Sequence, residues 1–537
     1  MSKTLISDSA ANANFDGGKG LKSGAIGLFG SVVVGVASTA PAYSLAASLG
    51  FIVATGGGAI LAGKQAPAIV LLAFIPMYFI AQAYKELNQV DPDCGTTFAW
   101  ASRAFGAVTG WMGGWGVVIA DIIVMSNLAY IAGQYSFVFI GGFGLPQVAA
   151  LGGNYWASTI VGLVWIALMT WICYRGIEIS ARLQIFLLGF EVLMLLVFST
   201  IALVRVSTGN GVAGHSIAFS WDWFNPLGLD FGSVIAPALL TAIFIYWGWD
   251  SAVSVNEETK DPTRTPGRAA VISTVLLLVT YLLVTVATVS FAGIGTKGIG
   301  LGNPATSGDV FSAMAPAVFG SSGIGSVLQV LFAATILTSA AASTQTTILP
   351  TARTTLSMAV HKAIPSRFSR IHPRFLTPTW STIGMGLVSA VLFLVFTAIS
   401  LNLLNALIGS LGLMIAFYYG LTGLACTWFF RRTLFSSVRN FVFRGLFPLL
   451  GFLSLAAIFV YGLISFAAPD WLTDDAGKNV TIFGIGAEAV VGVLGLLIGF
   501  VFMAIYWAKN PAFFRGQVLP RTVYIEGEPL PGPAPVE

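Results

Sequence analysis

Long apolar segments recur along almost the whole chain and limit its fold more than any other feature of the sequence. A helix that crosses a membrane needs about 20 mostly apolar residues. The chain contains twelve such segments, centred near residues 40, 76, 122, 164, 191, 243, 281, 337, 388, 414, 455 and 494. The ninth and tenth are separated by little more than residues 400–402. We therefore predict an all-α membrane protein with twelve transmembrane helices.

The composition agrees with a chain whose main solvent is lipid. Apolar residues make up 56% of the sequence and charged residues only 9%, whereas a soluble domain carries about 25% charged residues. The short loops leave no room for a catalytic domain, and the sequence has neither a nucleophile–histidine–acid set nor metal-ligand spacing. We expect neither an enzyme nor a cofactor, and no nucleic-acid partner.

The basic residues alternate between the two sides of the predicted bundle. With the N-terminus inside, the inner segments hold 22 of the 26 Lys and Arg residues. The four outside are Lys64, Arg205, Lys297 and Lys478. This asymmetry follows the positive-inside rule and predicts a multi-pass protein of the cell (cytoplasmic or inner) membrane with both termini cytoplasmic. Residues 1–24 and 511–537 are polar or proline-rich, so we predict disordered tails there.

Two of the twelve segments should be interrupted. The first contains small residues and then Pro41, which lacks an amide hydrogen and clashes with the preceding turn. The sixth contains the run Trp247-Gly248-Trp249-Asp250. Interrupted helices at matching positions in two halves indicate the binding site of a transporter, because an unwound backbone needs a polar cavity. A simple kink in each helix is the alternative.

Four carboxylates lie inside the apolar segments: Asp121, Glu191, Asp250 and Glu488. A charge at mid-membrane costs about 2.5–3.5 kcal/mol, so such residues usually face a cavity or a partner. We expect Asp121 and Asp250 to be functional, with a structural bond to a neighbouring helix as the alternative for Asp121. For Glu191, a structural role as a neutral, hydrogen-bonded side chain is as well supported as a functional one. Glu488 lies near the outer interface of the membrane.

Three loop motifs carry a resemblance to a known family. They are residues 256–269 (NEETKDPTRTPGRA), residues 92–106 (PDCGTTFAWASRAFG) and a third stretch from Ala352 to Pro378, with Ala352-Arg353, Met358, Ile364-Pro365, Arg367-Phe368, residues 371–375 (IHPRF) and Thr377-Pro378. On these motifs the chain resembles the amino acid–polyamine–organocation (APC) superfamily, specifically its bacterial amino acid permeases. The resemblance implies a five-plus-five inverted repeat with broken helices 1 and 6. It would divide the chain into residues 25–205 (helices 1–5), 206–430 (helices 6–10) and 431–510 (helices 11 and 12).

The resemblance also implies a substrate site between the two broken helices, bordered by helices three, eight and ten. Amides of Ala37, Ser38 and Thr39 would hold a carboxylate, and carbonyls near Trp247 and Gly248 an ammonium group. The remaining predicted site residues are Trp249, Asp250, Asp121 and Asn127, with Trp247 or Trp249 as a gate.

The sequence departs from the family pattern at the first break and in the fifth segment. Gly35-Val36-Ala37-Ser38 stands where relatives often have Gly-x-Gly, and the fifth segment lacks the lysine with which some relatives carry a coupling proton. Thr338 and Ser339 would form a weak sodium site, or ordinary helix-packing contacts.

Together these observations predict a secondary active transporter, a permease that imports an amino acid by alternating access. A polyamine or other cationic amine such as putrescine is the alternative substrate, with Asp121 and Asp250 as its counter-charges. An ion channel is not expected, because no filter sequence repeats. The sequence names neither the substrate nor the driving force, which could be protons, sodium or an exchanged substrate.

Overall fold

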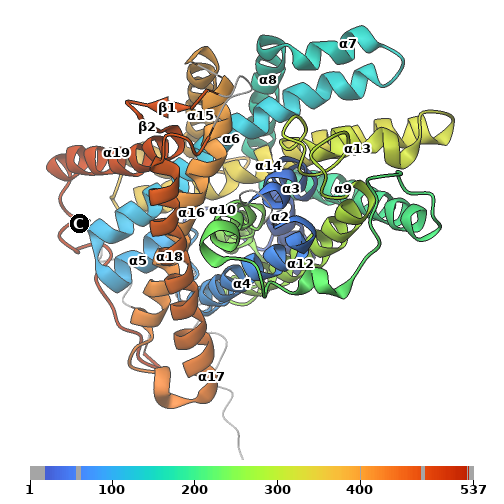
Figure 1. Cartoon of the computed structure of the whole chain (residues 1–537). Coiled ribbons are helices and arrows are strands. Elements are labelled where there is room, and N and C mark those ends of the chain that lie inside the picture. Colours follow the sequence, from blue (N-terminus) through green and yellow to red (C-terminus); the bar gives the residue numbers. More distant parts are fainter. Residues whose placement is uncertain (1–17, 56–61, 400, 473–477, 529, 531–537) are drawn as a thin grey trace, which may run out of the picture.

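The computed structural model describes residues 18–55, 62–399, 401–472, 478–528 and 530, and it is mostly helical (Figure 1). Eleven of its helices are long and apolar enough to cross a membrane. The described strands are β1 (Thr481–Ile482) and β2 (Ile485–Gly486), which pair in an antiparallel hairpin just before the last long helix. The prediction of a mostly helical protein with many membrane-spanning helices is therefore confirmed for the described part of the chain.

The helices of the first part of the chain end at Ser207. They are α2 (Leu28–Ser38), α3 (Pro41–Ala54), α4 (Ala66–Val90), α5 (Thr97–Phe105), α6 (Ala107–Gly141), α7 (Pro146–Ala150), α8 (Tyr155–Arg175) and α9 (Ile177–Ser207). Short 3-10 turns precede α4 (η1, Gly63–Gln65) and α8 (η2, Leu151–Gly153).

The helices of the second part begin at Phe231. They are η4 (Phe231–Ile235), α10 (Ala236–Ile245), α11 (Ser251–Ser254), α12 (Thr265–Ala292), α13 (Val310–Phe319), α14 (Ile324–Val360), α15 (Thr379–Ile399), α16 (Leu401–Phe429), α17 (Val438–Asn440), η8 (Phe441–Leu446), α18 (Phe447–Ala467) and α19 (Ala487–Lys509). Shorter turns are η3 (Trp221–Phe224), η5 (Asn256–Glu258), η6 (Ser366–Ser369) and η7 (Leu434–Ser436).

The first apolar segment is interrupted where its sequence predicts a break. Helix α2 ends at Ser38, Ala40 adopts a left-handed conformation with φ 46°, and Pro41 begins α3. Proline suits this position because its φ is already helical and its missing amide would have no partner in the first turn. The break therefore follows from local backbone chemistry.

The sixth segment is also interrupted. Helix α10 ends at Ile245, residues 246–250 form a turn, and Gly248 has φ 119°, a conformation that L side chains rarely adopt. Because the chain unwinds here, the segment is the shorter apolar helix 231–245 and is not among the eleven long spans. The turn leads directly into α11 and η5.

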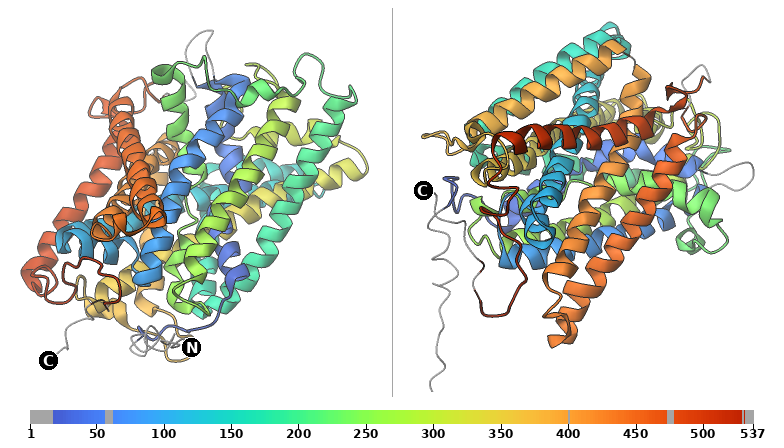
Figure 2. Two further views of the ribbon diagram at one scale, coloured as in Figure 1. Left: turned by 90° about the horizontal axis from the view of Figure 1, so that it is seen from below. Right: turned by 90° about the vertical axis from the view of Figure 1, so that its left-hand side faces the viewer.

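The interrupted helices lie in the middle of the bundle. Figure 1 shows α2, α3 and α10 surrounded by longer helices. Helix α6 packs against α14, and α12 packs against α2, α4 and α9. Helices α18 and α19 pack on α16 and lie at one edge of the molecule (Figure 2). The core therefore encloses both breaks.

Two segments near the termini are packed, and there the prediction of disorder is wrong. Of the predicted N-terminal tail, residues 1–17 lie outside the described residues, but Lys19 forms ion pairs with Asp93 and Glu257. Of the predicted C-terminal tail, residues 529 and 531–537 lie outside the described residues. Before them, Phe513 is buried, and the Thr522 amide donates a 2.9 Å hydrogen bond to the Arg103 carbonyl.

The prediction failed because it used only the polar composition of these two segments. Their few apolar side chains pack against the helix bundle, and composition does not show that contact. Residues 18–24 and 511–528 lie at the same end of the bundle, which we call the terminal end (Figure 2).

Candidate functional site

The two breaks touch each other through backbone atoms. A Cβ placed on Gly248 would lie 2.8 Å from both the carbonyl carbon and the carbonyl oxygen of Ser38. The hydroxyls of Ser38 and Ser251 are joined by a 2.8 Å hydrogen bond. Glycine is therefore needed at 248 both for its φ and for this close approach.

The backbone amides at the end of α2 are used locally. The amides of Thr39 and Ala40 donate to the carbonyls of Val36 and Ala37, each at 3.1 Å. The Ser38 carbonyl in turn accepts a 2.9 Å hydrogen bond from the Ser343 hydroxyl on α14. Of the predicted carboxylate-binding amides, that of Thr39 therefore caps its own helix in this structure.

The first amides of α3 are satisfied by side chains of two other helices. Pro41 has no amide hydrogen, and the Ala42 amide donates to Glu191 Oε1 of α9 at 2.7 Å. The Tyr43 amide donates to the Ser339 hydroxyl of α14 at 3.2 Å, and that hydroxyl donates to Glu191 Oε1 at 2.7 Å. A carboxylate therefore already occupies the positive end of this half-helix.

At the second break, Asp250 accepts hydrogen bonds from two adjacent tyrosines of α16. The Tyr419 hydroxyl lies 2.8 Å from Asp250 Oδ1, and the Tyr418 hydroxyl lies 3.2 Å from Oδ2. Tyr418 also accepts from the Trp247 indole nitrogen, and Tyr419 from the Gly248 amide at 3.4 Å. The second break is thus bound to α16 through a buried polar network.

The two predicted gate tryptophans have different surroundings. Trp249 is completely buried, with its ring centroid 5.1 Å from that of Tyr84 and 5.0 Å from that of Tyr419. Trp247 is buried too, but its indole nitrogen reaches Tyr418. Trp249 is therefore a packing residue of an aromatic cluster, whereas Trp247 belongs to the polar network.

Helix α6 contributes two predicted residues, both buried. Asp121 Oδ2 accepts a 2.7 Å hydrogen bond from the Thr351 hydroxyl of α14. Asn127 Oδ1 accepts from the Tyr43 hydroxyl of α3. Asp121 and Asp250 are both buried, and they lie close enough for their negative charges to repel each other.

The two predicted sodium ligands point to different partners. The Thr338 hydroxyl donates to the Thr335 carbonyl in its own helix at 3.1 Å, whereas the Ser339 hydroxyl reaches Glu191. Glu191, Tyr43, Ser343, Tyr418 and Tyr419 are the residues that sequence reasoning missed or ranked too low. The adjacent tyrosines in the tenth segment and the hydroxyl-rich eighth segment were the signals available.

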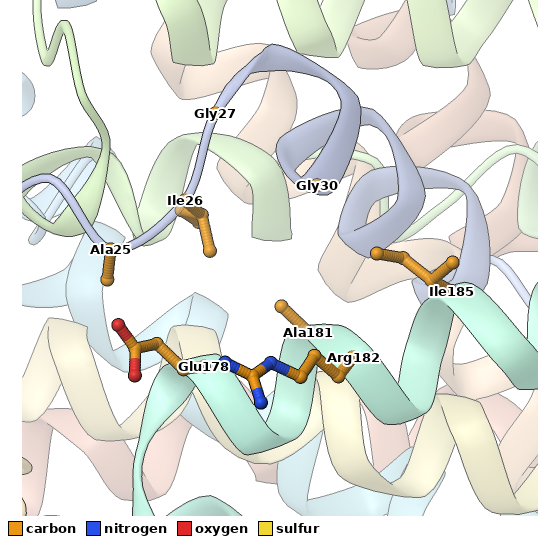
Figure 3. Close-up of a pocket in the computed structure, with 8 residues that line it drawn as sticks. All are labelled: Ala25, Ile26, Gly27, Gly30, Glu178, Ala181, Arg182 and Ile185. Atoms are coloured by element: carbon orange, nitrogen blue, oxygen red, sulfur yellow. The ribbon is translucent and has the colours of Figure 1, made fainter.

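A cavity of about 220 Å³ lies at the terminal end, between the start of α2 and the first turns of α9 (Figure 3). In Figure 3 the Glu178 carboxylate points toward Ala25, and the Arg182 side chain runs along α9 toward Glu178. None of the predicted site residues lines this cavity. It is therefore distinct from the buried region where the breaks meet.

The terminal end also holds a buried ionic cluster around Lys19. Its ammonium lies 3.0 Å from Asp93 Oδ2 and contacts Glu257. Burial alone would raise the pKa of the Asp93 carboxyl, but Lys19 and hydrogen bonds from His361 and Ser357 hold it well below its usual value. Burial acts to lower the pKa of Lys19, and its carboxylate partners raise it well above the ordinary value. Both groups are therefore charged at neutral pH.

Comparisons with known proteins agree with this architecture. The profile of the family described as "Amino acid permease" matches residues 27–487. The branched-chain amino acid permease BcaP of Bacillus subtilis is 25% identical over 350 residues, which are 64% of this chain and 70% of that protein. The methylthioribose transporter of the same organism is 25% identical over 66% of this chain and 74% of its own length.

A plant protein and a solved structure extend the likeness. The cationic amino acid transporter 3, mitochondrial, of Arabidopsis thaliana is 26% identical over 62% of this chain and 53% of its own length. The crystal structure of MhsT in complex with L-phenylalanine superposes with a TM-score of 0.56 at 14% identity, covering 80% of this chain and 98% of MhsT. That likeness shows the fold alone. With broken helices that meet in a buried polar centre and a profile match over most of its length, the chain belongs to the amino acid permease family, whose members are membrane transporters.

Proposed function

We propose that this chain is a secondary active transporter that moves an amino acid across the cytoplasmic membrane by alternating access. The observation that carries the proposal is the contact between the two breaks, where Gly248 lies against the Ser38 backbone. Two half-helices that meet in this way offer unwound peptide groups to one ligand. The names of the amino acid permease relatives and the phenylalanine bound to MhsT support an amino acid as that ligand.

The proposed architecture is twelve membrane-spanning helices, with helices 1–5 (residues 25–205) and 6–10 (residues 206–430) as inverted repeats. Helices 11 and 12 (residues 431–510) lie outside the repeats, and the interrupted sixth segment supplies the span that is too short to be one of the eleven. The terminal end faces the cytoplasm, which places both termini inside. The distribution of Lys and Arg supports this orientation.

The proposed substrate site lies between the breaks and is bordered by α6, α14 and α16. The ammonium group of the substrate would be held by carbonyls near Trp247 and Gly248, with Asp250 and Asp121 as nearby negative charges. Its carboxylate would be held at the first break, by amides of Ala37, Ser38 and Thr39 once their present partners are released. Trp247 and Trp249 border the site, and Asn127 is joined to it through Tyr43.

Uptake into proteoliposomes tests the proposal. Purified full-length protein is reconstituted and presented with a panel of labelled amino acids and amines, with and without a pH or sodium gradient. Saturable, gradient-stimulated uptake of at least one amino acid above protein-free liposomes is expected. Protein that is folded by size-exclusion chromatography but accumulates no amino acid under any gradient would refute the proposal.

Competition by putrescine tests the alternative substrate class. An amino acid transporter should take up labelled leucine in the presence of excess putrescine, since the diamine has no carboxylate for the first break. The Asp250→Asn variant should reduce leucine uptake. If putrescine blocked uptake and Asp250→Asn abolished only diamine transport, a cationic amine would be the substrate.

A further inference from the structure

Glu191 is a carboxylate with one satisfied and one unsatisfied oxygen. Its side chain has 0% exposure, and Oε1 accepts from the Ala42 amide and the Ser339 hydroxyl, each at 2.7 Å. Oε2 is buried and has no hydrogen-bond partner among the described residues. An ionised carboxylate is costly in such a place, because no donor among the described residues stabilises its second oxygen.

The N-terminus of α3, its positive end, has few backbone amides free to bind a second anion. Pro41 contributes none, the Ala42 amide is taken by Glu191, and the Tyr43 amide is taken by Ser339. A half-helix N-terminus stabilises one nearby anion. A substrate carboxylate that docks at this break therefore meets a second negative charge in a low-dielectric interior, where like charges repel strongly.

Basic side chains on α9 are too far away to neutralise Glu191. Arg182 and Arg205 lie nine and fourteen residues along the helix, which corresponds to about 13 and 21 Å. The elements packed on α9 are α2, α3, α8, α12, α13 and α14. Their ionisable residues are Tyr43 on α3, Tyr155, Cys173, Tyr174 and Arg175 on α8, Arg268 and Tyr281 on α12, and Arg353 on α14. Of these, Tyr281 interacts with Glu191, and its hydroxyl donates to the Ile245 carbonyl.

We propose, building on the transport function above, that Glu191 gains a proton when the substrate carboxylate binds at the first break, beside the start of α3, and loses it when the substrate leaves. The proton comes from water on the entry side and bonds to Oε2. Neutral Glu191 then no longer competes for the positive end of the half-helix. Upon release of the substrate the proton returns to water and Glu191 again caps Ala42.

Thermodynamic linkage makes this proposal measurable. If binding of the substrate carboxylate requires uptake of one proton, protonation and substrate binding strengthen each other equally. The substrate then binds more tightly as pH falls, by at most about tenfold per pH unit. A slope that arises from Glu191 disappears when Glu191 is replaced by a residue that does not titrate, and leucine itself does not titrate between about pH 5 and 8.

The test compares two glutamates that each have a buried Oε2 without a hydrogen-bond partner among the described residues. Glu191→Gln keeps the acceptor oxygen and removes the charge. Glu488→Gln is the matched control, because Glu488 on α19 is also buried with an unpartnered Oε2 but lies beside Gly409, away from the breaks. The full-length protein and both variants are titrated with leucine, or with the amino acid that the uptake panel identifies, from about pH 5 to pH 8.

The wild type and Glu488→Gln should bind more tightly as pH falls, whereas Glu191→Gln should bind with the same affinity throughout. In weakly buffered solution with a pH dye, substrate binding to the wild type should remove about one proton per site. Wild-type binding without proton uptake overturns the proposal, even if Glu191→Gln fails to fold. Retained pH dependence in Glu191→Gln, or dependence on sodium in place of pH, overturns it too. A wild type that binds no amino acid at all refutes the transport function instead.

Discussion

Arg353 and Glu258 form an ion pair with no exposed side-chain surface on either partner. The guanidinium donates from Nε to Oε2 and from Nη2 to Oε1, each at 2.9 Å. Burial raises the pKa of the Glu258 carboxyl, and Arg353 offsets this only in part. The pair connects η5, which closely follows the second break, to the C-terminal part of α14. It therefore holds the end of the broken sixth helix in place.

Removal of one partner of this pair should be much more damaging than removal of both. Arg353→Met leaves a buried uncompensated carboxylate, so we expect a loss of about 3–5 kcal/mol of folding stability. The double variant Arg353→Met/Glu258→Leu should recover much of that loss. Thermal unfolding of the detergent-solubilised protein by tryptophan fluorescence measures it. A single variant as stable as the wild type would contradict the prediction.

The Lys19–Asp93 pair should stabilise the terminal end over a wide pH window. Asp93 has a lowered pKa, so its contribution is present above the ordinary value of 3.8 and is lost as pH falls below it. Lys19 has a raised pKa, so its contribution is present below 10.5 and is lost as pH rises through the folded value. Between these limits Lys19→Met should cost about 1.5–3 kcal/mol, the usual worth of hydrogen bonds to charged groups.

Lys22 provides the matched control for Lys19. It pairs with Glu178, and the two side chains are 44% and 39% exposed. Lys22→Met should therefore change stability by less than about 1 kcal/mol. Denaturant midpoints of both variants at several pH values check the comparison. Equal effects of the two substitutions, or a Lys19 effect that already disappears near pH 6, would show that the buried cluster does not act as described.

Gly248→Ala should disable the meeting point of the breaks. A side chain at φ 119° costs about 1–3 kcal/mol, and its Cβ would meet the Ser38 backbone at 2.8 Å. We expect amino acid uptake to fall at least about tenfold, which corresponds to about 1.4 kcal/mol. Gly189→Ala on α9 is the control, since nothing lies within 4 Å of its added Cβ. Normal uptake by Gly248→Ala would show that the close contact is dispensable.

Tyr419→Phe should weaken substrate binding more than Tyr418→Phe. Tyr419 donates the shorter hydrogen bond to Asp250, 2.8 Å against 3.2 Å, and also accepts from the Gly248 amide. Loss of a hydrogen bond to a buried charge costs about 1.5–3 kcal/mol, which predicts an affinity at least about tenfold lower. Tyr78→Phe on α4, an aromatic packing residue, serves as the control. Binding isotherms in detergent would decide, and equal affinities in all three variants would count against the network.

The sequence by itself determined the class of fold and the positions of both breaks. Apolar segments of membrane length, few charges and a one-sided distribution of Lys and Arg depend only on composition along the chain. Pro41 and Gly248 act on their own backbone, so their effect is readable locally. The same reasoning identified Asp250 and Asp121 as buried carboxylates without any knowledge of their partners.

Tertiary structure alone decided what those residues touch. Glu191 meets Ala42 across 149 positions of sequence, and Tyr419 meets Asp250 across 169. The sequence gives equal reasons for Glu191 to be structural or functional, because only helix packing places it at the start of α3. Likewise Phe513 is buried although its segment is polar and proline-rich, since the bundle supplies an apolar surface that composition does not record. Adjacent residues determine the local backbone conformation, whereas the packing of the helices determines which side chains meet across them.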